Sequence, residues 1–105
     1  MNQPDRAQML KEVLKENPKD AFARYGLALE YAKAGEIEAA LAEFKTLLEL
    51  HPEYVPGYQM AAQTLLDAGR EQEGKGMLEK GIACAKKSGN QHAQSEMEMM
   101  LAELE

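Results

Sequence analysis

The chain has 105 residues, of which 45% are hydrophobic and 29% charged, and its formal net charge is −6. This length fits one compact domain, residues 1–105, and the composition is that of an ordinary globular protein rather than a disordered one. The negative charge repels phosphate backbones and anionic lipid surfaces, so neither nucleic acid nor a membrane is an expected partner.

The first predicted element is a helix near residues 3–16. Leu10, Val13 and Leu14 recur there at the three- and four-residue spacing of one helix face, and Pro18 follows the helix. Nowhere along the chain do apolar residues alternate in twos over the length of a strand. This pattern predicts an all-α fold.

Two helices follow, near residues 20–34 and 36–50, and Gly35 separates them. Glycine readily adopts the left-handed conformation that ends a helix, so Gly35 marks the boundary between the two. In the second of these helices one stripe is apolar and the opposite face is polar. The stripe consists of Ile37, Ala40, Leu41, Phe44, Leu47 and Leu48. A turn this short forces the two helices to run antiparallel.

The same pattern returns in the following segment. Helices are predicted near residues 55–68 and 71–87, with Gly69 between them, and a sixth helix follows a break at residues 88–90. Gly35 and Gly69 are 34 residues apart. A shift of the chain by this distance superposes the apolar residues of the two helix pairs: Ala28 on Ala62, Tyr31 on Leu65, Phe44 on Leu78 and Leu48 on Ile82.

A helix pair that repeats every 34 residues resembles the tetratricopeptide repeat family. The family pattern is matched at Leu27, Ala28, Tyr31, Ala40, Phe44, Leu47 and Pro52. Arg24 departs from it, since a large apolar residue is usual there. The resemblance implies an all-α, antiparallel helix-pair superhelix of about six helices. Its expected parts are a half repeat (3–18), two repeats (21–54 and 55–88) and a capping helix (91–104).

The last helix departs from the strict repeat. An unbroken 34-residue period would place Glu96 at a core position. The apolar stripe instead consists of Ala93, Met97, Met100, Leu101 and Leu104. One extra residue in the preceding turn restores the match, so we expect residues 91–104 to cap the array by packing on the fourth and fifth helices.

Three glycines interrupt the fifth helix. Gly74, Gly76 and Gly81 each cost about 1 kcal/mol relative to alanine inside a helix. One explanation is a close helix crossing at Gly74 and Gly81, where no side chain holds the helix axes apart. The other is a locally unstable helix over residues 71–87 that opens or repacks when a partner binds.

The sequence carries no pattern typical of enzyme chemistry. His51 and His92 have no second histidine or cysteine at metal-ligand spacing, and Cys84 stands alone. We expect surface or capping roles for the histidines and a half-buried apolar role for Cys84. The sequence therefore predicts no catalytic activity, no metal site and no cofactor.

The family resemblance implies a concave groove lined by the first helix of each pair. Carried over residue by residue, the groove residues are Phe22, Tyr25, Leu29 and Lys33, then Gln59, Met60, Gln63 and Asp67, then Gln94, Glu98 and Leu101 of the capping helix. Some family members hold the C-terminal carboxylates of chaperones with cations in this groove. Here Tyr25, Leu29 and Met60 occupy such positions, so we do not expect binding of a chaperone tail.

We therefore predict a non-catalytic protein–protein interaction module, an adaptor or assembly helper, that binds a peptide or partner helix in this groove. The alternative is a structural protein that forms a homodimer or larger homo-oligomer through the same faces. A third hypothesis, a thiol sensor built on Cys84, requires a lowered thiol pKa that nothing in the sequence provides. The lone cysteine and the lack of an apolar signal or membrane span predict a cytoplasmic location.

Overall fold

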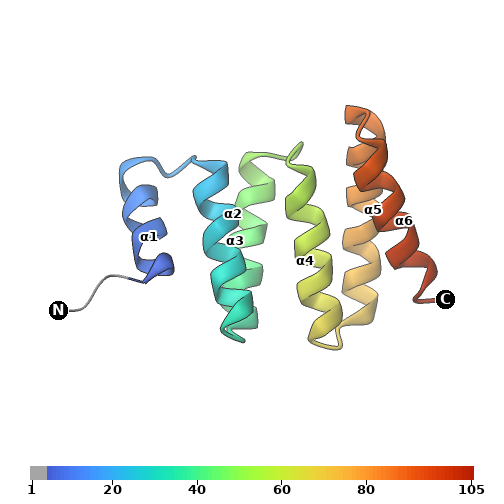
Figure 1. The fold of residues 1–105 in the computed structure, drawn as a ribbon, viewed down its shortest axis with the longest axis horizontal. Helices are drawn as coiled ribbons and strands as arrows, with labels where there is room; N and C mark the ends of the chain where they lie inside the picture. The colour runs from blue at the N-terminus through green and yellow to red at the C-terminus, as the bar shows by residue number, and fades with distance from the viewer. Residues whose placement is uncertain (1–4) are drawn as a thin grey trace.

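The computed structural model describes residues 5–105, which form six α-helices and no strand (Figure 1). The helices are α1 (Arg6–Glu16), α2 (Ala21–Lys33), α3 (Ile37–Leu50), α4 (Val55–Asp67), α5 (Glu71–Ser88) and α6 (Gln91–Ala102). This confirms the predicted all-α fold class, and the five later helices begin and end within two residues of their predicted bounds. The predicted start of the first helix, at residue 3, lies outside the described residues.

Short polar side chains begin three of the helices. Asp5, Asp20 and Asn90 each accept a hydrogen bond from the backbone amide three residues later, which satisfies one of the amides left unpaired at a helix start. Gly35 and Gly69 have φ angles of 80° and 77°, so both adopt the left-handed conformation. Their predicted roles at helix ends are confirmed.

The helices stack side by side into an elongated array that measures 49 × 28 × 20 Å (Figure 1). α2 contacts α4 and α4 contacts α6, whereas α1, α3 and α5 make no backbone contact with one another in the described part of the chain. The layer formed by α2, α4 and α6 is therefore the tighter one, and the array curves toward it. We call this the concave side and the opposite one the convex side.

Two clusters of buried side chains hold the array together. The first lies around Phe44 and Leu47 of α3, which pack against α2 and α4. The second lies around Leu78 of α5 and Met97 of α6. All four side chains are fully buried, and each contributes roughly 1.5–3 kcal/mol of apolar burial. The predicted stripe of α6 is confirmed, because its members are buried or packed against the second cluster: Ala93, Met97, Met100, Leu101 and Leu104.

Two glycines bring α5 close to its neighbours. A Cβ atom added at Gly81 would lie 2.8 Å from Tyr58 Cβ and 2.5 Å from Met97 Sδ. One added at Gly74 would lie 2.6 Å from Leu66 Cδ2. Real Cβ contacts are almost never this short, so the predicted close helix crossing at Gly74 and Gly81 is confirmed.

α1 packs differently from its counterparts α3 and α5. Phe44 and Leu78 are fully buried, but Leu10, at the equivalent position, is only half-buried, and no residue of α1 is buried. Val13 corresponds in the repeat to the fully buried Leu47, but it is 43% exposed. The reason is that α1 has one neighbour, α2, so its other side faces solvent.

Candidate functional site

The predicted groove residues of α2 and α4 lie on two helices that contact each other on the concave side. Tyr25, Leu29 and Met60 are half-buried and pack against the first core cluster. Phe22 is 69% exposed, more than any other large hydrophobic side chain of the described residues. We call these four residues the concave apolar patch. It combines side chains anchored in the core with one that is open to solvent.

Polar residues border the concave apolar patch. Gln59 and Gln63 are half-buried, and the Gln63 side-chain amide donates a hydrogen bond of 2.8 Å to the Asp67 carboxylate. Lys33 and Asp67 are exposed near the ends of α2 and α4. The concave side therefore presents amides and single charges rather than a cluster of cations.

An aromatic pair supports one end of the concave apolar patch. The rings of Tyr25 and Tyr54 are tilted by 50°, with centroids 5.5 Å apart, a favourable geometry for aromatic side chains. Burial raises the pKa of the Tyr25 hydroxyl, and Tyr54 raises it further. Tyr54 immediately precedes α4, so the pair links α2 to the start of α4.

The predicted groove residues of α6 lie apart from the concave apolar patch. Leu101 packs against the second core cluster and, with Glu98, lines a hollow of about 420 Å³ between α5 and α6. Gln94 is half-buried, and its side chain donates a hydrogen bond of 3.3 Å to Glu98. The structure thus brings the α2 and α4 residues together and directs Leu101 toward α5.

The largest hollow that we describe lies on the convex side and was not predicted from the sequence. It has a volume of about 630 Å³ and runs between α3 and α5, with α4 beneath it. Apolar side chains form most of its floor: Leu41, Phe44, Leu48, Tyr58, Ala61, Leu65 and Met77. We call it the convex groove. The available signal was the apolar stripe of α3, because Leu41 and Leu48 belong to it and are only half-buried.

An ionic clamp bridges one end of the convex groove. Arg70 donates hydrogen bonds to Glu73 at 2.7 and 2.9 Å, and to Glu38 of α3. The hydrogen bonds from Arg70 lower the pKa of the Glu73 carboxyl, and those to Glu73 and Glu38 raise the pKa of Arg70 despite some loss of hydration. The two glutamates are exposed, so the clamp connects α3 to the start of α5 but contributes little to stability.

Arg24 replaces the apolar residue expected in α2 and forms an ion pair with Glu43 of α3. The Arg24 Nη1 and Glu43 Oε1 atoms are 2.7 Å apart, and the two side chains are only 16% and 22% exposed. Arg24 also donates a hydrogen bond to the backbone oxygen of Pro18, but its buried Nε atom has no partner among the described residues. The pair therefore joins α2 to α3 at some cost in desolvation.

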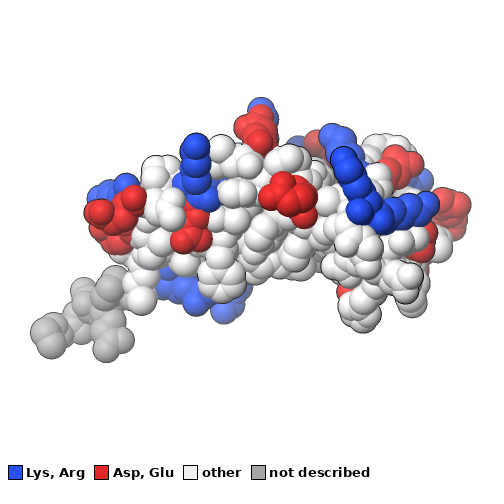
Figure 2. Space-filling view, turned by 90° about the horizontal axis from the view of Figure 1, so that it is seen from above, with Lys and Arg blue, Asp and Glu red and all other residues white. Residues whose placement is uncertain are grey.

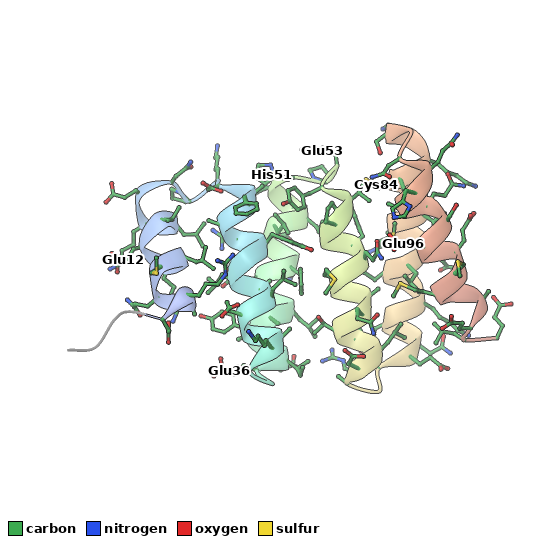
Figure 3. The ribbon with its side chains drawn as sticks, in the orientation of Figure 1. Glu12, Glu36, His51, Glu53, Cys84 and Glu96 are labelled. Carbon is green, nitrogen blue, oxygen red and sulfur yellow. The ribbon has the colours of Figure 1, made fainter. Side chains whose placement is uncertain are left out.

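His51 and Cys84 lie near the turn between α3 and α4 (Figure 3). His51 caps the C-terminus of α3, and its Nε2 atom donates a hydrogen bond of 2.8 Å to the backbone oxygen of Lys19. Cys84 is half-buried, and its thiol is 3.5 Å from the backbone oxygen of Pro52. Burial raises the pKa of the Cys84 thiol, Glu53 raises it further and Lys87 opposes the effect. The raised pKa disfavours the thiolate that a thiol sensor requires.

Acidic and basic side chains are mixed along the upper edge of the array, where the turn between α3 and α4 and the end of α5 lie (Figure 2). Viewed from above, acidic and basic side chains lie scattered among uncharged ones, with the largest basic group over the end of α5 (Figure 2). The last turn of α5 carries Lys86 and Lys87. Within residues 5–105, no group of three or more His, Cys, Asp or Glu side chains is placed to hold a metal ion, and no helix is both long and apolar enough to cross a membrane.

Known proteins resemble the chain in sequence and in fold, although no family model matches it. A TPR repeat-containing protein of Pseudomonas aeruginosa is 28% identical over 96 residues, which are 91% of each chain. The solution structure of a tetratricopeptide repeat domain protein from Salinibacter ruber is 31% identical, with a TM-score of 0.79, and the match covers 85% of this chain and 90% of that one.

Two further structures extend the comparison. A crystal structure of a tetratricopeptide repeat domain protein, also from Salinibacter ruber, is 30% identical with a TM-score of 0.73 and covers 81% of this chain and 94% of that one. The solution structure of a Bordetella parapertussis protein has a TM-score of 0.85 at 24% identity, covering 97% and 89% of the two chains. The latter supports the similarity in fold alone.

Proposed function

Because the chain belongs to the tetratricopeptide repeat family, whose fold is typical of protein–protein interaction modules, we propose that it binds a peptide or partner helix on its concave side. It acts in this proposal as an adaptor or assembly helper in the cytoplasm. Proteins of this family are generally non-catalytic scaffolds, and we assign no catalytic role to any residue.

The observation that carries the proposal is the concave apolar patch. Phe22 leaves 69% of its surface in water, next to the half-buried residues of the same helix, Tyr25 and Leu29. Aromatic side chains that are partly anchored and partly exposed contribute strongly to binding, because little side-chain entropy is lost when a partner covers them. Met60 on α4 extends the patch across the contact between α2 and α4.

The chemistry of the concave side defines the kind of ligand. Apolar side chains bordered by the amides of Gln59 and Gln63 suit a short segment with two or three apolar anchors and a polar backbone or side-chain edge. Lys33 is the basic residue among the predicted groove positions of α2 and α4. A segment that is recognised through several carboxylates would therefore find too few cations on the concave side to offset the cost of removing those carboxylates from water.

The proposal is tested by affinity capture from a lysate of the source cell, with proteins identified by mass spectrometry. The wild type is compared with Phe22→Ser and Leu29→Glu, each shown to be folded by circular dichroism. The matched control is Leu50→Ser, because Leu50 is an exposed apolar side chain of α3 outside the predicted groove. A partner retained by the wild type and the control but lost by both groove variants supports the proposal.

Two outcomes contradict it. A partner retained equally by all four proteins would place the binding surface elsewhere. Recovery of the protein alone, in an amount that Phe22→Ser reduces, would favour the alternative in which the concave side forms a homo-oligomer.

A further inference from the structure

Two features of the molecule are left unexplained by binding on the concave side. One is the open side of α1, which lacks a helix neighbour. The other is the convex groove between α3 and α5. Each is apolar at its centre and charged at its border. The border of the convex groove carries both acidic and basic residues, of which Lys45 and Lys80 form no ion pair with a described residue.

The open side of α1 is an amphipathic acidic face. Met9, Glu12, Val13 and Glu16 follow the spacing i, i+3, i+4 and i+7 and therefore share one side of the helix. Met9 and Val13 are 56% and 43% exposed. Figure 3 shows Glu12 on the side of α1 that points away from α2. Glu12 forms an ion pair with exposed Lys15 at 3.5 Å and accepts a hydrogen bond of 3.4 Å from the Gln8 side chain, and both are exposed contacts of little energetic weight.

The convex groove carries basic residues on both walls. Lys45 of α3 and Lys80 of α5 line it, are exposed, and form no ion pair with any described residue. Arg70, in contrast, is already paired within the ionic clamp at one end. The groove thus offers an apolar floor with one unpaired lysine on each side, and Glu49 is the remaining unpaired charge at its border.

We propose that α1 of one copy docks its Met9 and Val13 side chains into the convex groove of a second copy, with Glu12 and Glu16 facing Lys45 and Lys80. The apolar side chains supply the attraction and the opposite charges fix the register of the docked helix. This interface uses neither α2 nor the concave apolar patch, so it can form while a partner occupies the concave side.

The occupant must be a second copy rather than the same chain. α1 packs on α2 at one end of the array, and α2, α3 and α4 separate it from α5 (Figure 1). The net charge of −6 on each copy opposes association, and salt screens this repulsion as well as the ion pairs. In this proposal the attraction therefore comes from the apolar contacts of Met9 and Val13 and from the local pairing of Glu12 and Glu16 with Lys45 and Lys80.

A charge exchange tests the docked pair directly. The first variant carries Glu12→Lys and Glu16→Lys, and the second carries Lys45→Glu and Lys80→Glu; all four residues are exposed, so both variants should fold. Molecular mass is measured by sedimentation over a range of concentrations for each variant, for the wild type and for the equimolar mixture. A control, Lys19→Glu with Lys86→Glu, makes the same charge change as the second variant at exposed residues that lie outside the convex groove, α1 and the predicted concave groove.

The proposal predicts that the wild type and the control associate as concentration rises. Each charge variant alone should associate at least about tenfold more weakly, because like charges then face each other. The mixture should associate as the wild type does, since every docked helix again meets a groove of opposite charge.

Three results would overturn the proposal. They are a wild type that stays monomeric at all concentrations, charge variants that associate like the control, or a mixture that fails to restore association. Phe22→Ser serves to separate this interface from the one proposed for the concave side. It should leave self-association unchanged even if the concave side binds no partner at all.

Discussion

The packing at Gly81 predicts how α5 responds to the addition of a single methyl group. A Cβ atom at this position would lie 2.8 Å from Tyr58 Cβ, which is fixed close to the backbone of α4 and cannot rotate away. Gly81→Ala gains up to about 1 kcal/mol of helix propensity. Overpacking of a core costs about 1–3 kcal/mol. We expect a net loss in the free energy of unfolding of about 1 kcal/mol.

Gly76 provides the matched control in the same helix. No heavy atom lies within 4 Å of a Cβ added there, so Gly76→Ala should keep the full gain in helix propensity and stabilise the protein by about 0.5–1 kcal/mol. The two variants should therefore differ by about 2 kcal/mol, or by roughly 10 °C in melting temperature for a domain of this size.

The assay is urea unfolding followed by far-ultraviolet circular dichroism, with thermal melts as a second measurement. The order of stability should be Gly76→Ala, wild type, Gly81→Ala. If Gly81→Ala proves as stable as Gly76→Ala, the close crossing of α5 with α4 and α6 is not the reason for glycine at this position.

Three further predictions concern the ion pair, a helix cap and the thiol. Glu43→Ala should lower the free energy of unfolding by about 2 kcal/mol because it leaves the largely buried Arg24 without its ion-pair partner. The double variant Arg24→Met with Glu43→Leu should stay within about 1 kcal/mol of the wild type. Urea unfolding measures both values. Asp20→Ala should cost about 1 kcal/mol and Asp20→Asn almost nothing, since both Asp and Asn accept the amide hydrogen bond at the start of α2; equal losses would contradict this. Because burial and Glu53 raise the pKa of Cys84, Glu53→Gln should speed its alkylation at a fixed alkaline pH, and an unchanged rate would refute that assignment. The folded thiol ionises at a higher pH than the unfolded one, so the contribution of Cys84 to stability should be constant well below its ordinary pKa and should fall as the pH rises through that value, as urea unfolding at alkaline pH will show.

The sequence predicted most of the helix array because local chemistry sets the helix boundaries. Gly35 and Gly69 end helices through their own conformational freedom, and the apolar stripes of α3 and α6 identify the sides that pack. The repeat pairs Val13 of α1 with the buried Leu47 of α3, but the two residues differ in burial. Periodicity shows which residues can share a face, but only the number of neighbouring helices determines whether that face is covered.

The convex groove could not be found from periodicity alone. Its walls belong to α3 and α5, and Arg70 reaches Glu38 over 32 residues of sequence. The residues of the two walls meet only because the helix pairs stack on each other. An apolar stripe that lines a groove also has the same helical spacing as an apolar stripe that is buried in a core, so the sequence cannot distinguish the two. The sequence did show that Arg24 departs from the repeat pattern, but only the structure identifies Glu43 as its partner.

Amide hydrogen exchange with and without a captured partner tests the central claim, that the concave side binds another polypeptide. We predict that the partner slows exchange in Ala21–Lys33 and Val55–Asp67, beneath the concave apolar patch. Slower exchange confined to Ile37–Leu50 and Glu71–Ser88, with α2 and α4 unchanged, would contradict the claim and place the partner on the convex side.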